Sequence, residues 1–121
     1  FSASPADIIV VNLGTNDSIA FSSSVGNEAD FYEGYLELIK KFRAASPNAA
    51  IICTYGAMGI NQSVENGILQ AVETLNNEGD DSVYYMSFIP NNSGSAGHPN
   101  AAAHKIMAAD LYEFIKINDI C

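Results

Sequence analysis

The stretch DIIVVNLGTND (residues 7–17) decides the fold, because a continuous apolar run gives way to a glycine and then to an Asn-Asp pair. An uninterrupted run of this kind is typical of a strand that is covered on both faces of a sheet. We therefore expect a buried strand over 7–13 that ends at Gly14. Asn16 and Asp17 then follow just beyond its carboxyl end.

Two further apolar runs repeat this pattern. AAIICTY (49–55) and SVYYMSF (82–88) are predicted to be buried strands, and 14–27 to be a polar loop. Three helices are predicted from apolar residues at helical spacing: Phe31, Tyr35, Leu38, Ile39 and Phe42; Val64, Ile68, Leu69, Val72 and Leu75; Ile106, Met107, Leu111, Phe114 and Ile115. Ser46-Pro47-Asn48 should end the first helix, and Asn100 should cap the last. Alternating strands and helices indicate an α/β fold with a parallel sheet.

The parallel topology also predicts where ligands bind. In open α/β sheets they bind beyond the carboxyl ends of the strands. The loops 14–17, 56–61 and 91–98 all belong to that edge, so their polar side chains should converge.

Composition limits the classes of partner. The formal net charge of −9 over 121 residues argues against nucleic acid and anionic membranes, and fits neutral substrates such as sugars or uncharged esters. No apolar run approaches the roughly 18 residues of a membrane helix. Cys53, within a predicted strand, is expected to be a small buried hydrophobe. Together with Cys121 it forms neither a disulfide framework nor a zinc motif.

Two residues could carry chemistry. Asn16 could donate its amide N–H to an oxyanion, or could belong to an Asn-Asp turn in which Asp17 caps the next segment. His98 precedes Pro99 just before the last helix, where it could act as a general base or be an exposed loop residue. His104, inside that helix, is interpreted as structural.

Together, VVNLGTND (10–17) and GHPNAAAHKIMA (97–108) resemble the third and fifth sequence blocks of the SGNH (GDSL-type) esterase and lipase family. The resemblance implies a three-layer α/β/α, flavodoxin-like sandwich, to which this chain supplies about three strands and three helices. It implies that Asn16, supported by Gly14 and Asp17, serves the oxyanion hole and that His98 is the catalytic histidine. VVNLGTND and AAIICTYGAMG (49–59) look like the acetylxylan-esterase branch of the carbohydrate esterases.

The chain departs from the family at the nucleophile. The family's Gly-Asp-Ser block, and the glycine block that completes the oxyanion hole, are absent before the predicted strand at 7–13. We expect residues 1–121 to be the C-terminal part of one SGNH hydrolase domain whose serine lies in a preceding segment. Asp-Ser-Ile (17–19) imitates the nucleophile block, and Ser18 stays as a less favoured alternative.

A second departure lies beside His98. The family places an aspartate three residues before the histidine, where this chain has Ser95. Some acetyl-polysaccharide esterases of this fold are thought to use a Ser-His dyad, so the Ser95 hydroxyl or a carbonyl within 93–96 could orient His98.

The resemblance implies a serine esterase that removes acyl groups, acetyl above all, from a carbohydrate, without metal or organic cofactor. Its partners would be the acylated carbohydrate or small ester and the missing N-terminal segment of the same domain, with neither nucleic acid nor membrane. A secreted or cell-surface location would suit such a substrate, and a cytoplasmic one stays open. The alternative is a non-catalytic, flavodoxin-like module that binds a ligand or partner.

Overall fold

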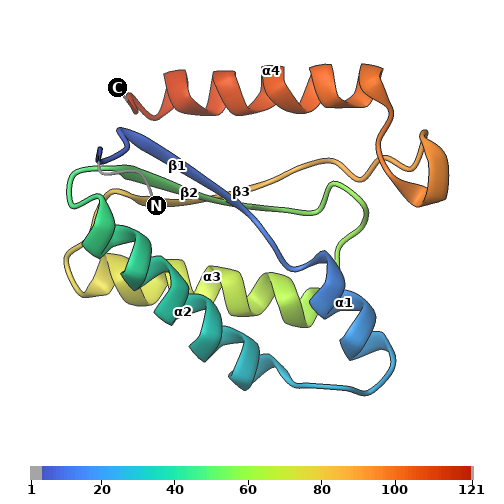
Figure 1. The fold of residues 1–121 in the computed structure, drawn as a ribbon, viewed down its shortest axis with the longest axis horizontal. Helices are drawn as coiled ribbons and strands as arrows, with labels where there is room; N and C mark the ends of the chain where they lie inside the picture. The colour runs from blue at the N-terminus through green and yellow to red at the C-terminus, as the bar shows by residue number, and fades with distance from the viewer. Residues whose placement is uncertain (1–3, 121) are drawn as a thin grey trace.

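The computed structural model describes residues 4–120 and contains one parallel three-stranded sheet (Figure 1). Its strands are β1 (Ile8–Asn12), β2 (Ala50–Tyr55) and β3 (Val83–Ser87), in the order β1-β2-β3. Val10 pairs with Ile52, and Ile52 pairs with Tyr84. All three predicted strands are confirmed, each within two residues of its expected ends.

Helices cover both faces of the sheet (Figure 1). α2 (Glu28–Ala45) and α3 (Gln62–Asn77) pack side by side on one face, and α4 (Ala101–Ile117) lies over the other. The three-layer α/β/α sandwich is therefore confirmed. Asn100 caps α4 as expected, since its Oδ1 accepts a hydrogen bond from the Ala103 backbone N–H at 2.9 Å.

The predicted polar loop over 14–27 is wrong, because residues Thr15–Ser22 form a fourth helix, α1. This helix has neither a regular apolar face nor a side-chain cap, and Ile19 on its surface is 63% exposed. Tertiary contacts therefore stabilise α1 rather than any pattern in its sequence. A short 3₁₀ turn, η1 (Ser95–Gly97), precedes His98.

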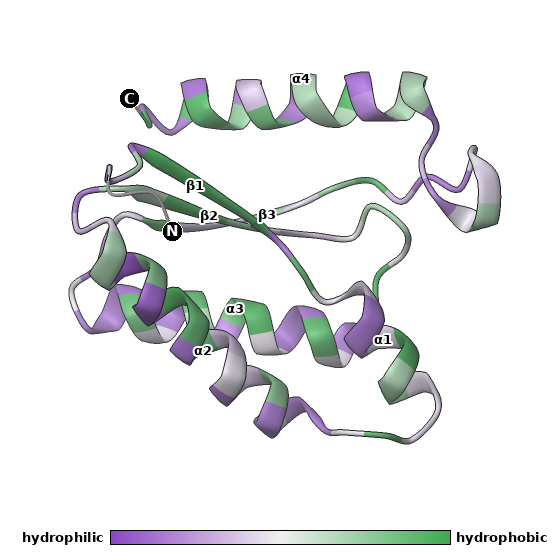
Figure 2. Cartoon of the chain, in the orientation of Figure 1, coloured by the Kyte–Doolittle hydropathy of each residue, from purple (hydrophilic) through white to green (hydrophobic). Residues whose placement is uncertain are grey.

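The main core lies between the sheet and the α2/α3 layer. Ile51, Cys53 and Tyr55 of β2 point into it and are almost completely buried. Figure 2 shows β1 and β2 as largely hydrophobic. The expectation that Cys53 is a buried hydrophobe is confirmed, and burial raises the pKa of its thiol to about 11. The thiol is therefore protonated at neutral pH, which makes it a poor nucleophile.

The opposite face is covered less completely. The edge-to-face contact of Tyr84 with Phe114, 6.4 Å between ring centres, joins β3 to α4. Val10 on the edge strand β1 is 44% exposed, and Ile106 and Ile117 of α4 are 59% and 78% exposed. Exposed apolar side chains therefore occur both on the β1 edge and on α4.

Arg43 holds the amino ends of the strands together. Its Nε and Nη2 donate to the two carboxylate oxygens of Asp80 at 2.8 and 3.0 Å, and its Nη1 donates to the Ala49 carbonyl at 2.5 Å. A bidentate arginine–carboxylate pair fixes geometry as well as charge. Arg43 thus ties α2 to the segments that enter β2 and β3.

Gly14 makes the turn from β1 into α1. Its φ of +118° is strained for residues with a side chain, and a Cβ there would lie 2.7 Å from Val64 Cγ1 and 3.2 Å from Tyr55 Cε2. Both neighbours belong to the core, so neither can move aside easily.

We expect Gly14→Ala to lower the free energy of unfolding by at least about 2 kcal/mol, because backbone strain and overpacking add. Urea denaturation measures this change. Gly34→Ala is the matched control: Gly34 lies inside α2 with open space around its Cα, so alanine should stabilise by about 0.5–1 kcal/mol. Equal effects at the two glycines would contradict this account of the turn.

Candidate active site

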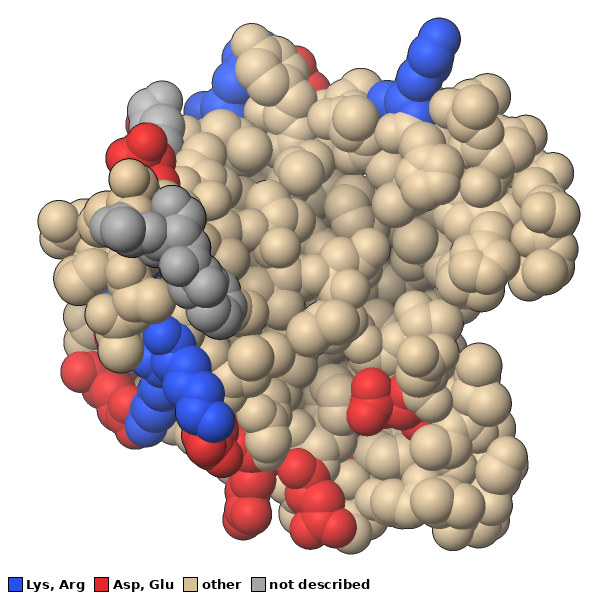
Figure 3. Space-filling view, in the orientation of Figure 1, with Lys and Arg blue, Asp and Glu red and all other residues tan. Residues whose placement is uncertain are grey.

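A cleft of about 250 Å³ opens at the carboxyl edge of the sheet and brings Asn16 and His98 together. We call it the Asn16–His98 cleft. Its walls come from the end of β1, the start of α1, the loop after β2 and the loop before α4; the lining residues are Asn12, Leu13, Gly14, Thr15, Asn16, Asp17, Met58 and His98. Figure 3 shows the molecule hollowed on the side where these segments meet.

Asn16 is the second residue of α1, and its side chain is exposed at the cleft. No side-chain hydrogen bond caps the start of α1, so the structure does not show the alternative in which Asp17 caps this segment. Asp17 lies in the first turn of α1, where a carboxylate interacts favourably with the positive end of the helix dipole. The Asn16 amide is therefore available to a ligand in the cleft.

His98 is held by a tight loop. The Gly94 N–H donates to the His98 carbonyl at 2.7 Å, and the His98 N–H donates to the Ser95 carbonyl at 3.1 Å. A Cβ on Gly94 would lie 2.7 Å from that His98 carbonyl, so this close approach requires glycine. Ala96 has a φ of +53°, a left-handed conformation that is uncommon for alanine. Strain of this kind is often found beside functional groups.

The His98 loop is attached to the loop that follows β2. The Asn91 N–H donates to the Ala57 carbonyl at 2.8 Å. With its amide turned so that Nδ2 faces the carbonyls, Asn92 donates to Gly97 at 2.9 Å and to Met58 at 3.3 Å. These bonds fix the loop of His98 relative to Met58, which also lines the cleft.

The His98 imidazole has no hydrogen-bond partner within residues 4–120, and it is exposed. The Ser95 hydroxyl does not bond to it, and the Ser95 carbonyl already accepts from the His98 backbone. Asp17 is the charged residue that lines the same cleft. His104 is exposed on α4 and lies outside the cleft, so the structure gives it no packing role.

Ser18 lies outside the Asn16–His98 cleft. Its hydroxyl donates to the Gly14 carbonyl at 2.9 Å and shares a short hydrogen bond with the Tyr55 hydroxyl. The Tyr55 hydroxyl also accepts from the Asn61 N–H at 3.0 Å. Tyr55, which is 1% exposed, thereby links β2 to the starts of α1 and α3.

Sequence reasoning missed four residues of the cleft: Asn12, Leu13, Thr15 and Met58. The loop that carries Met58 was expected at this edge, but spacing in a loop does not reveal which side chain faces a cleft. Neighbouring residues of a strand point to opposite faces, so the polar Asn12 after the buried Val11 was the one signal in the sequence that Asn12 faces away from the core.

No cluster of three or more metal-ligating side chains occurs among the described residues. None of the helices described there is long and apolar enough to cross a membrane.

The family model for GDSL-like lipases and acylhydrolases matches residues 2–111. The chain belongs to this GDSL-like family. It is 35% identical, over 124 aligned positions, to the cellulase/esterase CelE of Acetivibrio thermocellus, covering 96% of this chain and 15% of CelE.

Solved structures of GDSL-like relatives share the fold. A family two carbohydrate esterase from Clostridium thermocellum in complex with cellohexaose matches with a TM-score of 0.81 and 30% identity, over 94% of this chain and 36% of that one. The acetyl xylan esterase Est2A from Butyrivibrio proteoclasticus matches with a TM-score of 0.75 and 25% identity, over 94% and 37%. The chain thus spans little more than a third of these esterase structures.

The contribution of the Tyr55 hydroxyl to stability can be measured by removing it. We expect Tyr55→Phe to lower the free energy of unfolding by about 1–3 kcal/mol, because it leaves the Asn61 N–H and the Ser18 hydroxyl without their buried partner. Thermal or urea unfolding measures the change. Tyr112→Phe, at a site 61% exposed, is the control and should stay within about 0.5 kcal/mol of the parent. A Tyr55→Phe protein as stable as this control would show that the hydroxyl contributes nothing.

Proposed function

We propose that this chain is the histidine-bearing part of a serine esterase that removes acetyl groups from a carbohydrate. The observation that carries the proposal is the convergence of Asn16 and His98 in one cleft at the carboxyl edge of the sheet. An amide donor beside an accessible histidine is the pair that acyl transfer needs: one group stabilises an oxyanion and the other moves a proton.

The nucleophilic serine, in this proposal, lies in a segment that precedes the described sheet within the same SGNH hydrolase domain. Ser18 is less suited, because its hydroxyl is engaged with Tyr55 and Gly14 and lies outside the cleft. The exposed apolar side chains on the β1 edge and on α4 support the same idea, since further strands and a helix of the domain would cover them. Residues 1–121 alone should then be inactive.

The reaction follows from these positions. The serine attacks the ester carbonyl while His98 takes its proton, and His98 then gives that proton to the departing sugar oxygen, which leaves as a hydroxyl group. Asn16 donates its side-chain N–H to the oxyanion. A water molecule next attacks the acyl-enzyme, with His98 again as the base, and the proton passes from His98 to the serine oxygen as acetate leaves. Ser95 acts as a positioning residue through its turn, since its carbonyl accepts from the His98 N–H at 3.1 Å and so holds the backbone that carries the imidazole.

The carbohydrate substrate is inferred from two facts. The solved relatives include an acetyl xylan esterase and a carbohydrate esterase in complex with cellohexaose. The net charge of −9 disfavours anionic substrates. A polysaccharide substrate would place the enzyme outside the cell or on its surface.

Hydrolysis of p-nitrophenyl acetate by the full-length natural protein tests the proposal. We expect His98→Ala to lower kcat by about 10²–10⁴-fold and Asn16→Ala by about 10²–10³-fold. The 121-residue chain should show no turnover. His104→Ala, on an exposed helical position, is the matched histidine control and should retain the parental rate.

Two results would contradict the proposal. Activity of the 121-residue chain that is lost in Ser18→Ala would make Ser18 the nucleophile. A well-folded full-length protein without esterase activity would favour the non-catalytic binding module.

Ser95→Ala addresses the orientation of His98. We expect kcat to fall less than tenfold, because the Ser95 main chain already bonds to the His98 main chain and the turn would persist. Steady-state kinetics with p-nitrophenyl acetate measure the change. A loss well beyond tenfold, without loss of stability, would assign the orienting bond to the Ser95 hydroxyl.

A further inference from the structure

A second pocket adjoins the Asn16–His98 cleft. It has a volume of about 290 Å³, near the lower limit of the roughly 300–1,000 Å³ that small-molecule sites occupy. We call it the α1–α3 pocket; its lining residues are Thr15, Ser18, Ile19, Ser22, Met58, Gly59, Ile60 and Asn61. Thr15 and Met58 line both cavities, so a ligand could extend from one into the other.

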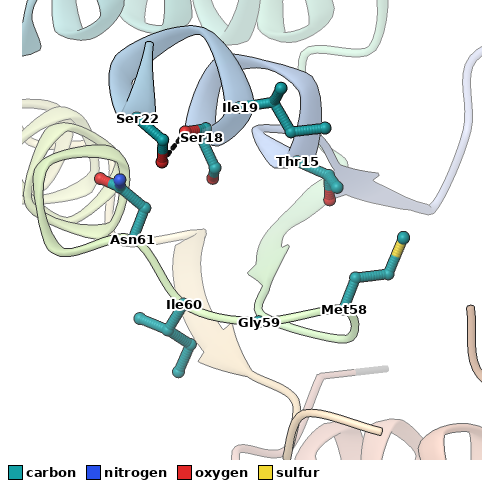
Figure 4. A pocket seen from close by; sticks show the side chains of 8 residues that line it. All are labelled: Thr15, Ser18, Ile19, Ser22, Met58, Gly59, Ile60 and Asn61. Carbon is teal, nitrogen blue, oxygen red and sulfur yellow. Dashed lines mark hydrogen bonds between the residues drawn. The ribbon is translucent and has the colours of Figure 1, made fainter. Parts of the chain in front are cut away.

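No charged side chain lines the α1–α3 pocket, although the chain as a whole is strongly acidic. Its polar lining consists of three hydroxyl side chains from α1 and the amide of Asn61. Figure 4 shows the Ser22 and Asn61 side chains pointing toward one another across the pocket, with Thr15 and Met58 at its other end. Such a lining suits a neutral ligand that carries hydroxyl groups and apolar C–H faces.

Asn61 offers fixed donors. Its Oδ1 accepts from the Ser63 and Val64 N–H groups at 3.0 and 3.3 Å and so caps α3. The cap settles the orientation of the amide, and Nδ2 then has no acceptor among the described residues. The Nδ2 group of this lining residue is therefore free to donate to a ligand, and the cap has already ordered the side chain.

Across the pocket, Ser22 offers an acceptor. Its hydroxyl donates to the Ser18 carbonyl at 2.9 Å, a bond that Figure 4 marks, and its lone pairs stay available. The wall that carries Ser22 is held by the bond between Ser18 and Tyr55. Donors on one wall and an acceptor on the other match the mixed hydrogen bonding of a sugar hydroxyl.

From this arrangement we propose that the α1–α3 pocket is a specificity subsite for one neutral sugar unit of the ester substrate. The ester lies between Asn16 and His98, and the sugar passes Thr15 and Met58 to bond with Asn61 and Ser22. This inference rests on the proposed esterase function, because the subsite has meaning only if the adjoining cleft holds the ester. A long acyl chain suits the pocket less well, since it would leave the Asn61 donors unpaired.

The test compares two substrates of the full-length natural protein: acetylated xylobiose and p-nitrophenyl acetate, which carries no sugar. Asn61→Asp keeps the α3 cap, since Asp and Asn cap equally well, but removes the donors. We expect the ratio of kcat/KM for acetylated xylobiose to that for p-nitrophenyl acetate to fall about tenfold, mainly through KM. Ser22→Phe, which fills the pocket from the opposite wall, should lower the same ratio.

Gln62→Glu is the matched control. It makes the same amide-to-acid change one residue further on, where the side chain contacts Glu65 and Asn66 and does not line the pocket. The ratio of kcat/KM for acetylated xylobiose to that for p-nitrophenyl acetate should be the same in Gln62→Glu as in the parent protein. Thermal unfolding of all variants shows whether a fall in ratio accompanies a loss of structure.

The outcomes separate the two proposals. A parent protein that hydrolyses both esters, with the same ratio in Asn61→Asp and Ser22→Phe, would overturn the sugar subsite and leave the esterase standing. Variants that change the preference for p-nitrophenyl butyrate over p-nitrophenyl acetate, but not the sugar ratio, would make the pocket an acyl site. A folded parent that hydrolyses neither ester would overturn the esterase, and the subsite with it.

Discussion

Gly14 has no side chain, and Tyr55 and Val64 occupy the space that a Cβ would need. This contact lets the chain turn from β1 into α1 directly against the core. The Ser18 hydroxyl then reaches both the Gly14 carbonyl and Tyr55. Asn16, two residues after the glycine, is placed by the same turn. The position of its amide in the cleft therefore depends on the close packing of Gly14 against Tyr55 and Val64.

The convergence of Asn16 and His98 could be predicted from the sequence alone. Both follow strands of one parallel sheet, and the carboxyl ends of parallel strands share an edge. α1 could not be predicted in the same way, because the contacts that support it come from Tyr55, which is 37 residues away from Ser18 in the sequence. The free Nδ2 donors of Asn61 could not be predicted either, because they are oriented only when Oδ1 of the same amide caps α3.

The two loops beside the cleft differ in how they are held. The β2–α3 loop is anchored from below by Tyr55, whereas the His98 loop depends on backbone bonds around Gly94 and on its attachment at Ala57 and Met58. The imidazole itself is left without a partner within the described chain. Its backbone is thus fixed while its ring can still turn to face a nucleophile. In the reaction that we propose, His98 accepts a proton from one oxygen and delivers it to another, and that freedom would serve both steps.

The Arg43–Asp80 pair lies at the amino ends of the strands, at the opposite edge of the sheet from the cleft. β1 begins and α4 finishes at that same distant edge (Figure 1). A tag, a fluorophore or a solid support attached near either of these points would stand away from the cleft. The molecule could therefore be immobilised there with the Asn16–His98 cleft facing away from the support.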